Sequence, residues 1–318
     1  MLQLEREKVN PILVPDKSNW WESKAVFNCS VLNDGKTIHM LYRAIVEYKD
    51  YVSRIGYASS NDGLLFSRRK EAAISPEVEY ERYGIEDPRL MTIEEKTYVT
   101  YVVLSNYVKN NPSISTALAE TDDFSHYKRL GIITFPGSED KDVVLFSKYN
   151  GESRFQRYMM LHRPSNWVGP QYNTDRPSIW IAEGDSFTNF KKHLPLVKPE
   201  QSWEALKIGV GVSPIETKKG WLVIYHGVST DHVYSAGAFL LDLKEPHKIL
   251  GRTKRPLLTP EEDYETKGDV NNVVFPTGAC ILDNKLFVYY GAADKVCCAA
   301  TVDLKEILDY LLSPACST

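Results

Sequence analysis

Two adjacent carboxylates, Glu86 and Asp87, precede a proline in the stretch YGIEDPR, which ends in Arg89. Pro88 has no backbone N–H and disfavours the helical conformation in the residue before it, so we expect Asp87 on a rigid turn. A carboxylic acid fixed in this way can serve as a general acid. A solvated turn with a local Asp–Arg pair would contain the same residues, so the motif alone does not decide between the two.

Groups suited to binding an oxyanion follow later in the chain. Arg163 lies in LHRP, Lys207 begins KIGVG, and Tyr225 and His226 lie in YHGV. The guanidinium offers a planar fork, the ammonium a point charge, and the imidazole and phenol further donors. Each residue also has a structural interpretation, as a salt-bridged strand end, a surface lysine or a core histidine. KIGVG lacks the spacing and the βαβ context of a dinucleotide-binding loop.

A further group of polar residues is suited to binding the hydroxyl groups of a sugar. The predicted substrate-binding residues are Asn28, Ser30, Arg43, Glu86, Arg89 and Asp294. Ordinary glycoside hydrolysis uses a pair of carboxylates, whereas here one acid accompanies a cationic set. That combination suits a reaction in which phosphate is the nucleophile, because phosphate needs cations and no base to activate water.

The elements that must position these residues recur along the chain. Five segments combine a turn with a strand of aromatic and β-branched residues, at 35–44, 95–104, 154–163, 219–228 and 284–293. The positions Tyr42, Tyr101, Leu161, Tyr225 and Tyr289 mark the repeat, with intervals of 59 to 64 residues. A second strand of small and apolar residues follows each segment, at 54–66, 113–124, 178–190, 234–243 and 296–304.

This repeat predicts an all-β protein, a five-bladed β-propeller in which residues at equivalent strand ends meet near one axis. A β-sandwich or a two-domain β protein is the alternative, and the regular interval disfavours it. Apolar residues at helical spacing predict one short C-terminal helix over 303–312. No linker-like stretch divides the chain, so we expect a single catalytic domain over residues 1–318.

The composition limits the class of protein. A net charge of −4 and a pI near 6.0 give no electrostatic footprint for nucleic acid. No apolar run approaches a membrane span, and the first residues carry charges where a signal peptide has an apolar run. The five cysteines form no metal-ligand pattern and suit reduced thiols. We therefore expect a cytoplasmic protein without a metal site.

The ordered motifs NPIL, GIEDPR, LHRP, YHGV, FPTG and YYGAAD resemble those of glycoside hydrolase family 130, the inverting β-mannoside phosphorylases and mannosidases. The resemblance extends over residues 10–312 and implies a five-bladed β-propeller with its site at the axis. It implies that Asp87 is the general acid, acting directly or through a sugar hydroxyl. The implied phosphate ligands are Arg163, Lys207, Tyr225 and His226, and the implied mannose ligands are Asn28, Arg43 and Asp294.

The resemblance therefore implies phosphorolysis of a β-mannoside to α-mannose 1-phosphate, with inorganic phosphate as co-substrate and no metal or organic cofactor. The contexts YERYGIEDPR and LHRPSNW look most like the enzymes for β-1,2-mannobiose or β-1,2-mannooligosaccharides. Enzymes for β-1,4-mannooligosaccharides or mannosyl-glucose are the alternative. The loops 165–176 and 262–274 would shape the acceptor site. Family members often form homo-oligomers, so we expect one here, and no membrane or nucleic-acid partner.

Two other functions stay open at this point. A hydrolytic β-mannosidase would need a carboxylate base, for which Glu86, Glu183 and Glu204 are available. A non-catalytic propeller that binds a glycan or a protein would not need Asp87. One departure from the family concerns an arginine that some members carry where this chain reads NNPSISTALAE. The candidates to complete the phosphate site in its place are Lys148, Arg154 and Arg157.

Overall fold

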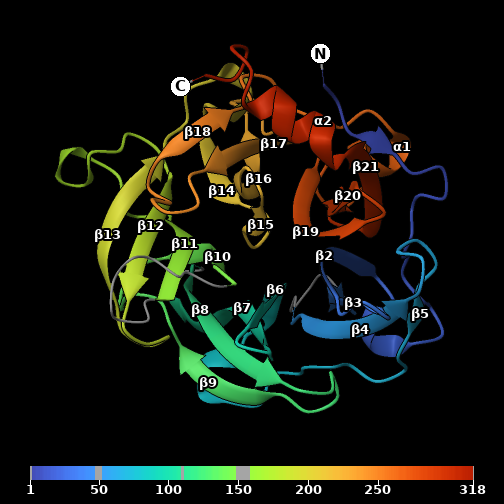
Figure 1. Ribbon diagram of the computed structural model, residues 1–318. Coiled ribbons are helices and arrows are strands. Elements are labelled where there is room, and N and C mark those ends of the chain that lie inside the picture. Colours follow the sequence, from blue (N-terminus) through green and yellow to red (C-terminus); the bar gives the residue numbers. More distant parts are fainter. Residues whose placement is uncertain (1, 47–51, 109–110, 148–157, 318) are drawn as a thin grey trace.

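The computed structural model describes residues 2–46, 52–108, 111–147 and 158–317, in which five antiparallel sheets surround a common axis (Figure 1). From the axis outwards, the first three blades are β2 (Ala25–Asn33), β3 (Ile38–Ile45), β4 (Arg54–Ser60) and β5 (Ser67–Arg68); β6 (Ile85–Ile93), β7 (Lys96–Val108), β8 (Asn111–Thr121) and β9 (Lys128–Ile132); and β10 (Asp140–Leu145), β11 (Tyr158–Pro164), β12 (Ile179–Gly184) and β13 (Phe190–Val197). The fourth blade is β14 (Lys207–Val210), β16 (Gly220–Val228), β17 (Tyr234–Leu241) and β18 (Ile249–Arg252), with β15 (Ile215–Thr217) also on β16, and the fifth is β19 (Val274–Leu282), β20 (Lys285–Ala292), β21 (Val296–Asp303) and β1 (Glu5–Arg6).

The predicted five-bladed propeller is confirmed, and the repeat in the sequence corresponds to the second and third strands of each blade. The predicted C-terminal helix is observed as α2 (Leu304–Leu311), which Asp303 caps by accepting the N–H of Glu306. The other helical turns are short: η1 (Trp20–Glu22), η2 (Glu79–Glu81), η3 (Pro170–Tyr172), η4 (Ser202–Glu204) and α1 (Asp263–Thr266). Within the described ranges, no helix is both long and apolar enough to cross a membrane.

The two ends of the chain meet in the fifth blade. Strand β1 pairs with β21, so an N-terminal segment completes a sheet whose other strands come from the C-terminal part of the chain (Figure 1). Leu4 is buried beside this strand, and its N–H donates to the carbonyl of Leu257. The ring is therefore closed by ordinary sheet hydrogen bonds rather than by a disulfide, since all five cysteines are free.

Four blades share a buried tyrosine that donates to a glutamate on the helical turn preceding the blade. An arginine on an outer strand pairs with the same glutamate and compensates its buried charge. The sets are Tyr42–Glu22–Arg68, Tyr101–Glu81–Arg129, Tyr225–Glu204–Arg252 and Tyr290–Glu265–Arg6. In the fifth blade the equivalent residue is thus Tyr290 and not the predicted Tyr289. In the third blade the position is Leu161, so this tyrosine is missing there.

Candidate active site

Three innermost strands carry a β-bulge at the same place, near the end at which the strand begins. The pairing register shifts after Phe27 in β2, after Glu86 in β6 and after Lys141 in β10. The residue that follows in each strand, Asn28, Asp87 or Asp142, has a left-handed backbone with φ of 50°, 50° and 57° respectively. Asn and Asp tolerate this conformation better than other side-chain-bearing residues, and bulges re-aim side chains. The bulges bring these three side chains to one pocket.

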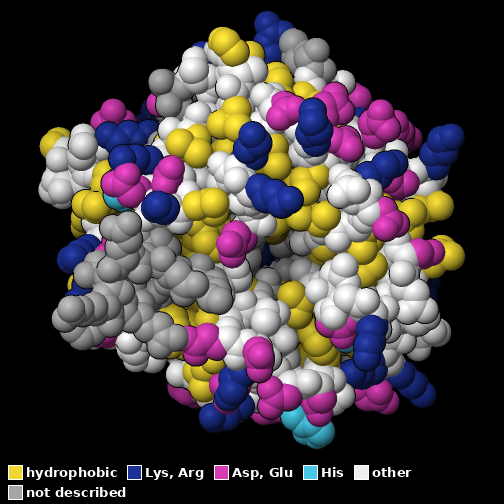
Figure 2. All heavy atoms as spheres, in the orientation of Figure 1, with side chains coloured by type: hydrophobic (Ala, Val, Ile, Leu, Met, Phe, Trp, Pro, Cys, Tyr) yellow, Lys and Arg dark blue, Asp and Glu magenta, His cyan; other side chains and the backbone are white. Residues whose placement is uncertain are grey.

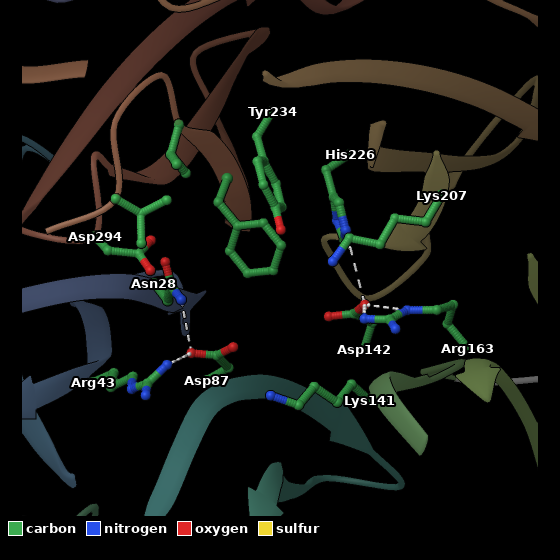
Figure 3. A pocket seen from close by; sticks show the side chains of 13 residues that line it. Asn28, Arg43, Asp87, Lys141, Asp142, Arg163, Lys207, His226, Tyr234 and Asp294 are labelled. Carbon is green, nitrogen blue, oxygen red and sulfur yellow. Dashed lines mark hydrogen bonds and ion pairs between the residues drawn. The ribbon is translucent and has the colours of Figure 1, made fainter. Parts of the chain in front are cut away.

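This pocket lies at one end of the axis and is lined by residues from all five blades (Figure 3). Its polar lining residues are Asn28, Arg43, Asp87, Lys141, Asp142, Arg163, Lys207, His226, Tyr234 and Asp294. Val270, Val273 and Phe275 supply the apolar part. Carboxylates and cations from all five blades thus meet in this pocket.

On one side of the pocket, Asp87 is held by its neighbours from the first blade. Its Oδ1 accepts from Nδ2 of Asn28 at 2.7 Å and lies 3.4 Å from a guanidinium nitrogen of Arg43. Both recorded bonds use the same oxygen, and Figure 3 shows the other oxygen pointing to the pocket interior. The adjacent Glu86 pairs with Arg43 and with Lys141. Burial alone would raise the pKa of Glu86, but these two cations lower it below its usual value.

On the opposite side, cationic and hydrogen-bonding groups surround Asp142. Arg163 donates from Nε and Nη2 to Oδ2 of Asp142 at 3.0 and 2.8 Å, and Nε2 of His226 lies 3.9 Å from the same oxygen. Burial would raise the pKa of Asp142, but Arg163, His226 and Arg89 hold it well below its usual range. Asp142 therefore stays ionised and fixes the guanidinium of Arg163 at the pocket.

Two other groups on this side have pKa values shifted by burial. Burial and the nearby Arg163 lower the pKa of Lys207 to about 8, so the ammonium is largely charged at neutral pH. Its Nζ lies 5.3 Å from the ring centroid of Tyr234. Burial also lowers the pKa of His226 to about 3, which makes it a neutral imidazole. This side of the pocket thus offers a guanidinium, an ammonium and a neutral ring donor to an anion.

Asp294 completes the side that contains Asp87. It has a left-handed φ of 50° and lies two residues after the end of β20. Burial raises its pKa to about 7, since the nearby Arg43 offsets only part of the cost of ionisation. Figure 3 shows its carboxyl group beside Asn28 and above Arg43. A carboxyl, an amide and a guanidinium in one place can bind several neighbouring hydroxyl groups.

The structure brings together most of the site residues predicted from the sequence. Seven of them line the pocket: Asn28, Arg43, Asp87, Arg163, Lys207, His226 and Asp294. Glu86 and Arg89 lie directly behind its wall, where Arg89 donates to the backbone carbonyl of Asp87 at 2.9 Å.

The position of Ser30 differs from the prediction. Its Oγ accepts the N–H of Leu90 in the wall between blades. It lines a second hollow, formed by the far ends of the innermost strands. Figure 2 shows the face of the molecule on which α2 lies, and this face has a hollow at its centre.

The prediction for Tyr225 is wrong. Its side chain is fully buried and donates to Glu204 at 2.8 Å, and Arg252 approaches the same hydroxyl at 3.2 Å. Successive residues of a strand face opposite sides of the sheet, so His226 reaches the pocket and its neighbour does not. Tyr225 belongs to the repeated Tyr–Glu–Arg set.

The sequence analysis missed Lys141, Asp142, Tyr234 and Phe275, all of which line the pocket. A signal for the first two was present, because KDVV in the third repeat occupies the place of FNCS and EDPR in the first two. The candidates Lys148, Arg154 and Arg157 lie outside the described residues. Of the suggested bases, Glu204 pairs with Arg252 away from the pocket and Glu183 lies near Lys192 on the outer strands.

Comparisons with known proteins agree with this geometry. The sequence model of the family Glyco_hydro_130, described as beta-1,4-mannooligosaccharide phosphorylase, matches residues 6–313. A 1,2-beta-oligomannan phosphorylase from a Thermoanaerobacter species is 38% identical and covers 96% of this chain and 99% of its own length. A beta-1,2-mannobiose phosphorylase from the same organism is 36% identical with the same coverage. A beta-1,4-mannooligosaccharide phosphorylase from Ruminococcus albus is 30% identical over 97% of this chain and 90% of its own.

Solved structures show the same fold. The beta-1,2-mannobiose phosphorylase of Listeria innocua, in complex with beta-1,2-mannobiose, superimposes with a TM-score of 0.83 at 29% identity, covering 97% of this chain and 99% of that one. A solved structure from Parabacteroides distasonis matches with a TM-score of 0.78 at 24% identity and covers 95% of this chain and 97% of that one, which supports the fold alone.

Proposed function

Because the chain belongs to glycoside hydrolase family 130, we propose that it is a phosphorylase that transfers the terminal mannosyl unit of a β-1,2-mannoside to inorganic phosphate. The products are α-mannose 1-phosphate and a sugar shortened by one unit, and the reaction is reversible. The β-1,2 linkage is supported by the relatives with the higher identity, which are named for β-1,2-mannosides. The β-1,4 linkage in the description of the family is the alternative.

The observation that carries this proposal is the division of the pocket. Asp87, Asn28 and Asp294 lie on one side, and Arg163 and Lys207 on the other (Figure 3). A mannosyl unit on the first side places its C1 between the acid and the cations. Phosphate on the second side then attacks C1 opposite the leaving group, which inverts the configuration. Asp87 supplies the proton for the leaving oxygen, directly or through a sugar hydroxyl.

Lys141 is the proposed additional phosphate ligand in place of the arginine that this chain lacks. Its Nζ lies 3.2 Å from Glu86 and lines the pocket between the two sides. Burial lowers the pKa of Lys141, but Glu86 and Asp87 more than offset this and raise it above its usual value, so the group is cationic. A lysine here neutralises charge as phosphate approaches the acid side.

Hydrolysis is the second candidate and would need a carboxylate base to activate water. Among the described residues, no glutamate lines the pocket. The lining carboxylate on the cationic side, Asp142, is held by two bonds from Arg163. These contacts favour phosphate over water as the nucleophile.

Product analysis tests the proposal. The purified protein is incubated with β-1,2-mannobiose or β-1,4-mannobiose, each with and without inorganic phosphate and each with and without EDTA. We expect mannose 1-phosphate from the β-1,2 substrate only when phosphate is present, and no effect of EDTA because acid catalysis and anion binding need no metal. Equal release of free mannose without phosphate would contradict the proposal and identify a mannosidase.

Two further properties belong to the same proposal. A cytoplasmic location is supported by five free cysteines, since secreted proteins commonly pair theirs. Assembly into a homo-oligomer stays a prediction, which light scattering coupled to size-exclusion chromatography tests directly.

A further inference from the structure

Asp142 is a carboxylate in the middle of the cationic side of the pocket. It is 4% exposed and lies among Arg89, Arg163 and His226. One of its oxygens, Oδ2, accepts both hydrogen bonds from Arg163. This oxygen holds Arg163 in place, but a carboxylate on the wall of a cationic site also repels any anion that binds there. Its second oxygen therefore needs an explanation.

That second oxygen, Oδ1, keeps unused capacity to accept a hydrogen bond. Its recorded neighbour among the described residues is Nη2 of Arg89 at 3.6 Å, which is an ion pair beyond hydrogen-bonding distance. Figure 3 shows Oδ1 pointing away from Arg163 and across the pocket towards Asp87. Because the surrounding cations keep Asp142 ionised, this oxygen can accept a hydrogen bond and cannot donate one.

An acceptor in an anion site distinguishes anions that carry a proton from those that do not. Inorganic phosphate carries at least one P–OH group at neutral pH, whereas sulfate has the same shape and no proton. Phosphate can donate a hydrogen bond from its P–OH group to Oδ1 of Asp142. Sulfate has no proton to donate, so one of its negatively charged oxygens would face the negatively charged Oδ1. Leaving the carboxylate unpaired, or facing another anion, is costly in a buried site.

We propose that Asp142 makes this site selective for phosphate over fully deprotonated oxyanions, by accepting a hydrogen bond from the P–OH group. The inference rests on the proposed phosphorolysis and adds the residue that determines which anion is used. The P–OH oxygen bound to Asp142 is kept away from C1, and an unprotonated oxygen is left to attack. The glycosidic C1–O bond breaks, and a new bond forms between C1 and the attacking phosphate oxygen. The proton of Asp87 goes to the leaving sugar oxygen, and the proton of the P–OH group stays on phosphate.

Asp142→Asn is the informative variant. The amide oxygen can still accept from Arg163, while the NH₂ group then faces the pocket as a donor. The bulge tolerates the change, because Asn28 has the same left-handed backbone at the equivalent position of the first blade. Asp283→Asn is a matched control, because Asp283 also has a positive φ, of 48°, but lies in an exposed turn between β19 and β20.

The experiment measures phosphorolysis with phosphate as the varied substrate and sulfate as a competitor, together with arsenate, which carries a proton as phosphate does. In the wild type we expect a sulfate inhibition constant at least tenfold above the KM for phosphate, and arsenate to replace phosphate at a similar KM. In Asp142→Asn the inhibition constant of sulfate falls at least tenfold relative to the KM for phosphate. Asp283→Asn keeps the wild-type ratio.

Sulfate that inhibits the wild type as tightly as phosphate binds would overturn the inference while leaving phosphorolysis intact, and this arm does not depend on how the variant folds. The inference would also be overturned if folded Asp142→Asn kept the wild-type ratio of the sulfate inhibition constant to the KM for phosphate while its KM for the mannoside rose. Asp142 would then bind a sugar hydroxyl. A wild type that makes no phosphate-dependent product would overturn the proposed function along with it.

Discussion

Asp87 is fixed both at its side chain and at its backbone, which suits a residue that must transfer one proton at a defined place. Asn28 and Arg43 bind one of its oxygens, and Arg89 holds its backbone carbonyl at 2.9 Å. Asp87→Asn keeps the shape and the left-handed backbone but removes the transferable proton. We expect kcat to fall by roughly 10²–10⁴-fold, the usual contribution of positioned acid catalysis.

Initial rates of mannose 1-phosphate release measure this effect, and circular dichroism shows whether the variant is folded. The KM for phosphate should stay within a few fold of that of the wild type, because the cationic side of the pocket is unchanged. A folded variant with a rate within tenfold of the wild type would show that Asp87 is not the acid.

Lys207 gives the pocket a pH dependence that its other cations do not share. Its pKa is lowered to about 8 by burial and by Arg163, so it is protonated below this pH and loses its charge as the pH rises through it. We expect the KM for phosphate to rise between pH 7 and pH 9, with the increase centred near pH 8. In Lys207→Arg this rise should disappear, because a guanidinium stays charged over the whole range. A rise of the same size in Lys207→Arg would assign the titration to another group.

The elements that hold these residues are stabilised by the buried Tyr–Glu–Arg sets. In the second blade, Tyr101 donates to Glu81 at 2.8 Å, and Arg129 donates to the same glutamate oxygen at 2.8 Å. Tyr101→Phe leaves this buried carboxylate with one donor fewer. We expect the free energy of unfolding to fall by about 1.5–3 kcal/mol, the usual value for a hydrogen bond to a charged group, with kcat unchanged.

Denaturant unfolding followed by tryptophan fluorescence measures the loss. Tyr172→Phe is the control, because the hydroxyl of this half-buried tyrosine has no recorded partner in the described part of the chain. A loss for Tyr101→Phe no larger than for this control would show that the set contributes nothing to stability.

The strands could be predicted because their pattern is local. The second strand of each blade combines β-branched and aromatic residues after a turn, and four of the five carry the tyrosine that the helical-turn glutamate needs. The choice of Tyr289 over Tyr290 was wrong because two tyrosines are adjacent, and only the hydrogen bond to Glu265 distinguishes them. The helical turns themselves are too short to produce a periodic signal.

The site was predictable where its residues stand beside a glycine or a proline, as Asp87 and His226 do. Lys141 and Asp142 stand before Val-Val, which reads as an ordinary strand, so the bulge that turns Asp142 inward was not recognised. Tyr225 was misassigned because its neighbour His226 faces the pocket, and strand alternation then turns Tyr225 away from it. Tyr234 and Phe275 reach the pocket by packing between the fourth and fifth blades, a contact between strands that are distant in the sequence.

The molecule as a whole depends on β1 to close the ring. This segment contributes the buried Leu4 and, through Arg6, two hydrogen bonds of 2.9 Å to Glu265. Removing residues 1–9 exposes the edge of β21 and takes away the buried side chains of Leu2 and Leu4. Burial of two leucines is worth about 3–6 kcal/mol, so we expect the melting temperature to fall by roughly 10 °C or more.

Differential scanning calorimetry of the shortened chain measures this fall. Glu5→Ala is the matched control, because Glu5 lies on the same strand with an exposed side chain. A shortened chain that melts within 2–3 °C of the full one, about the equivalent of 1 kcal/mol, would mean that the blades hold together without this closure.

The three bulges also have an evolutionary consequence. Asn28, Asp87 and Asp142 occupy equivalent backbone positions, yet one is an amide, one the proposed acid and one a fixed anion. Asn and Asp differ by a single isosteric substitution, and both tolerate the left-handed backbone. Related proteins with this fold can therefore diverge by Asn-to-Asp or Asp-to-Asn substitutions at these bulge positions, which change the charge and leave the backbone as it is. New substrates and new nucleophiles become accessible while the scaffold and its folding stay unchanged.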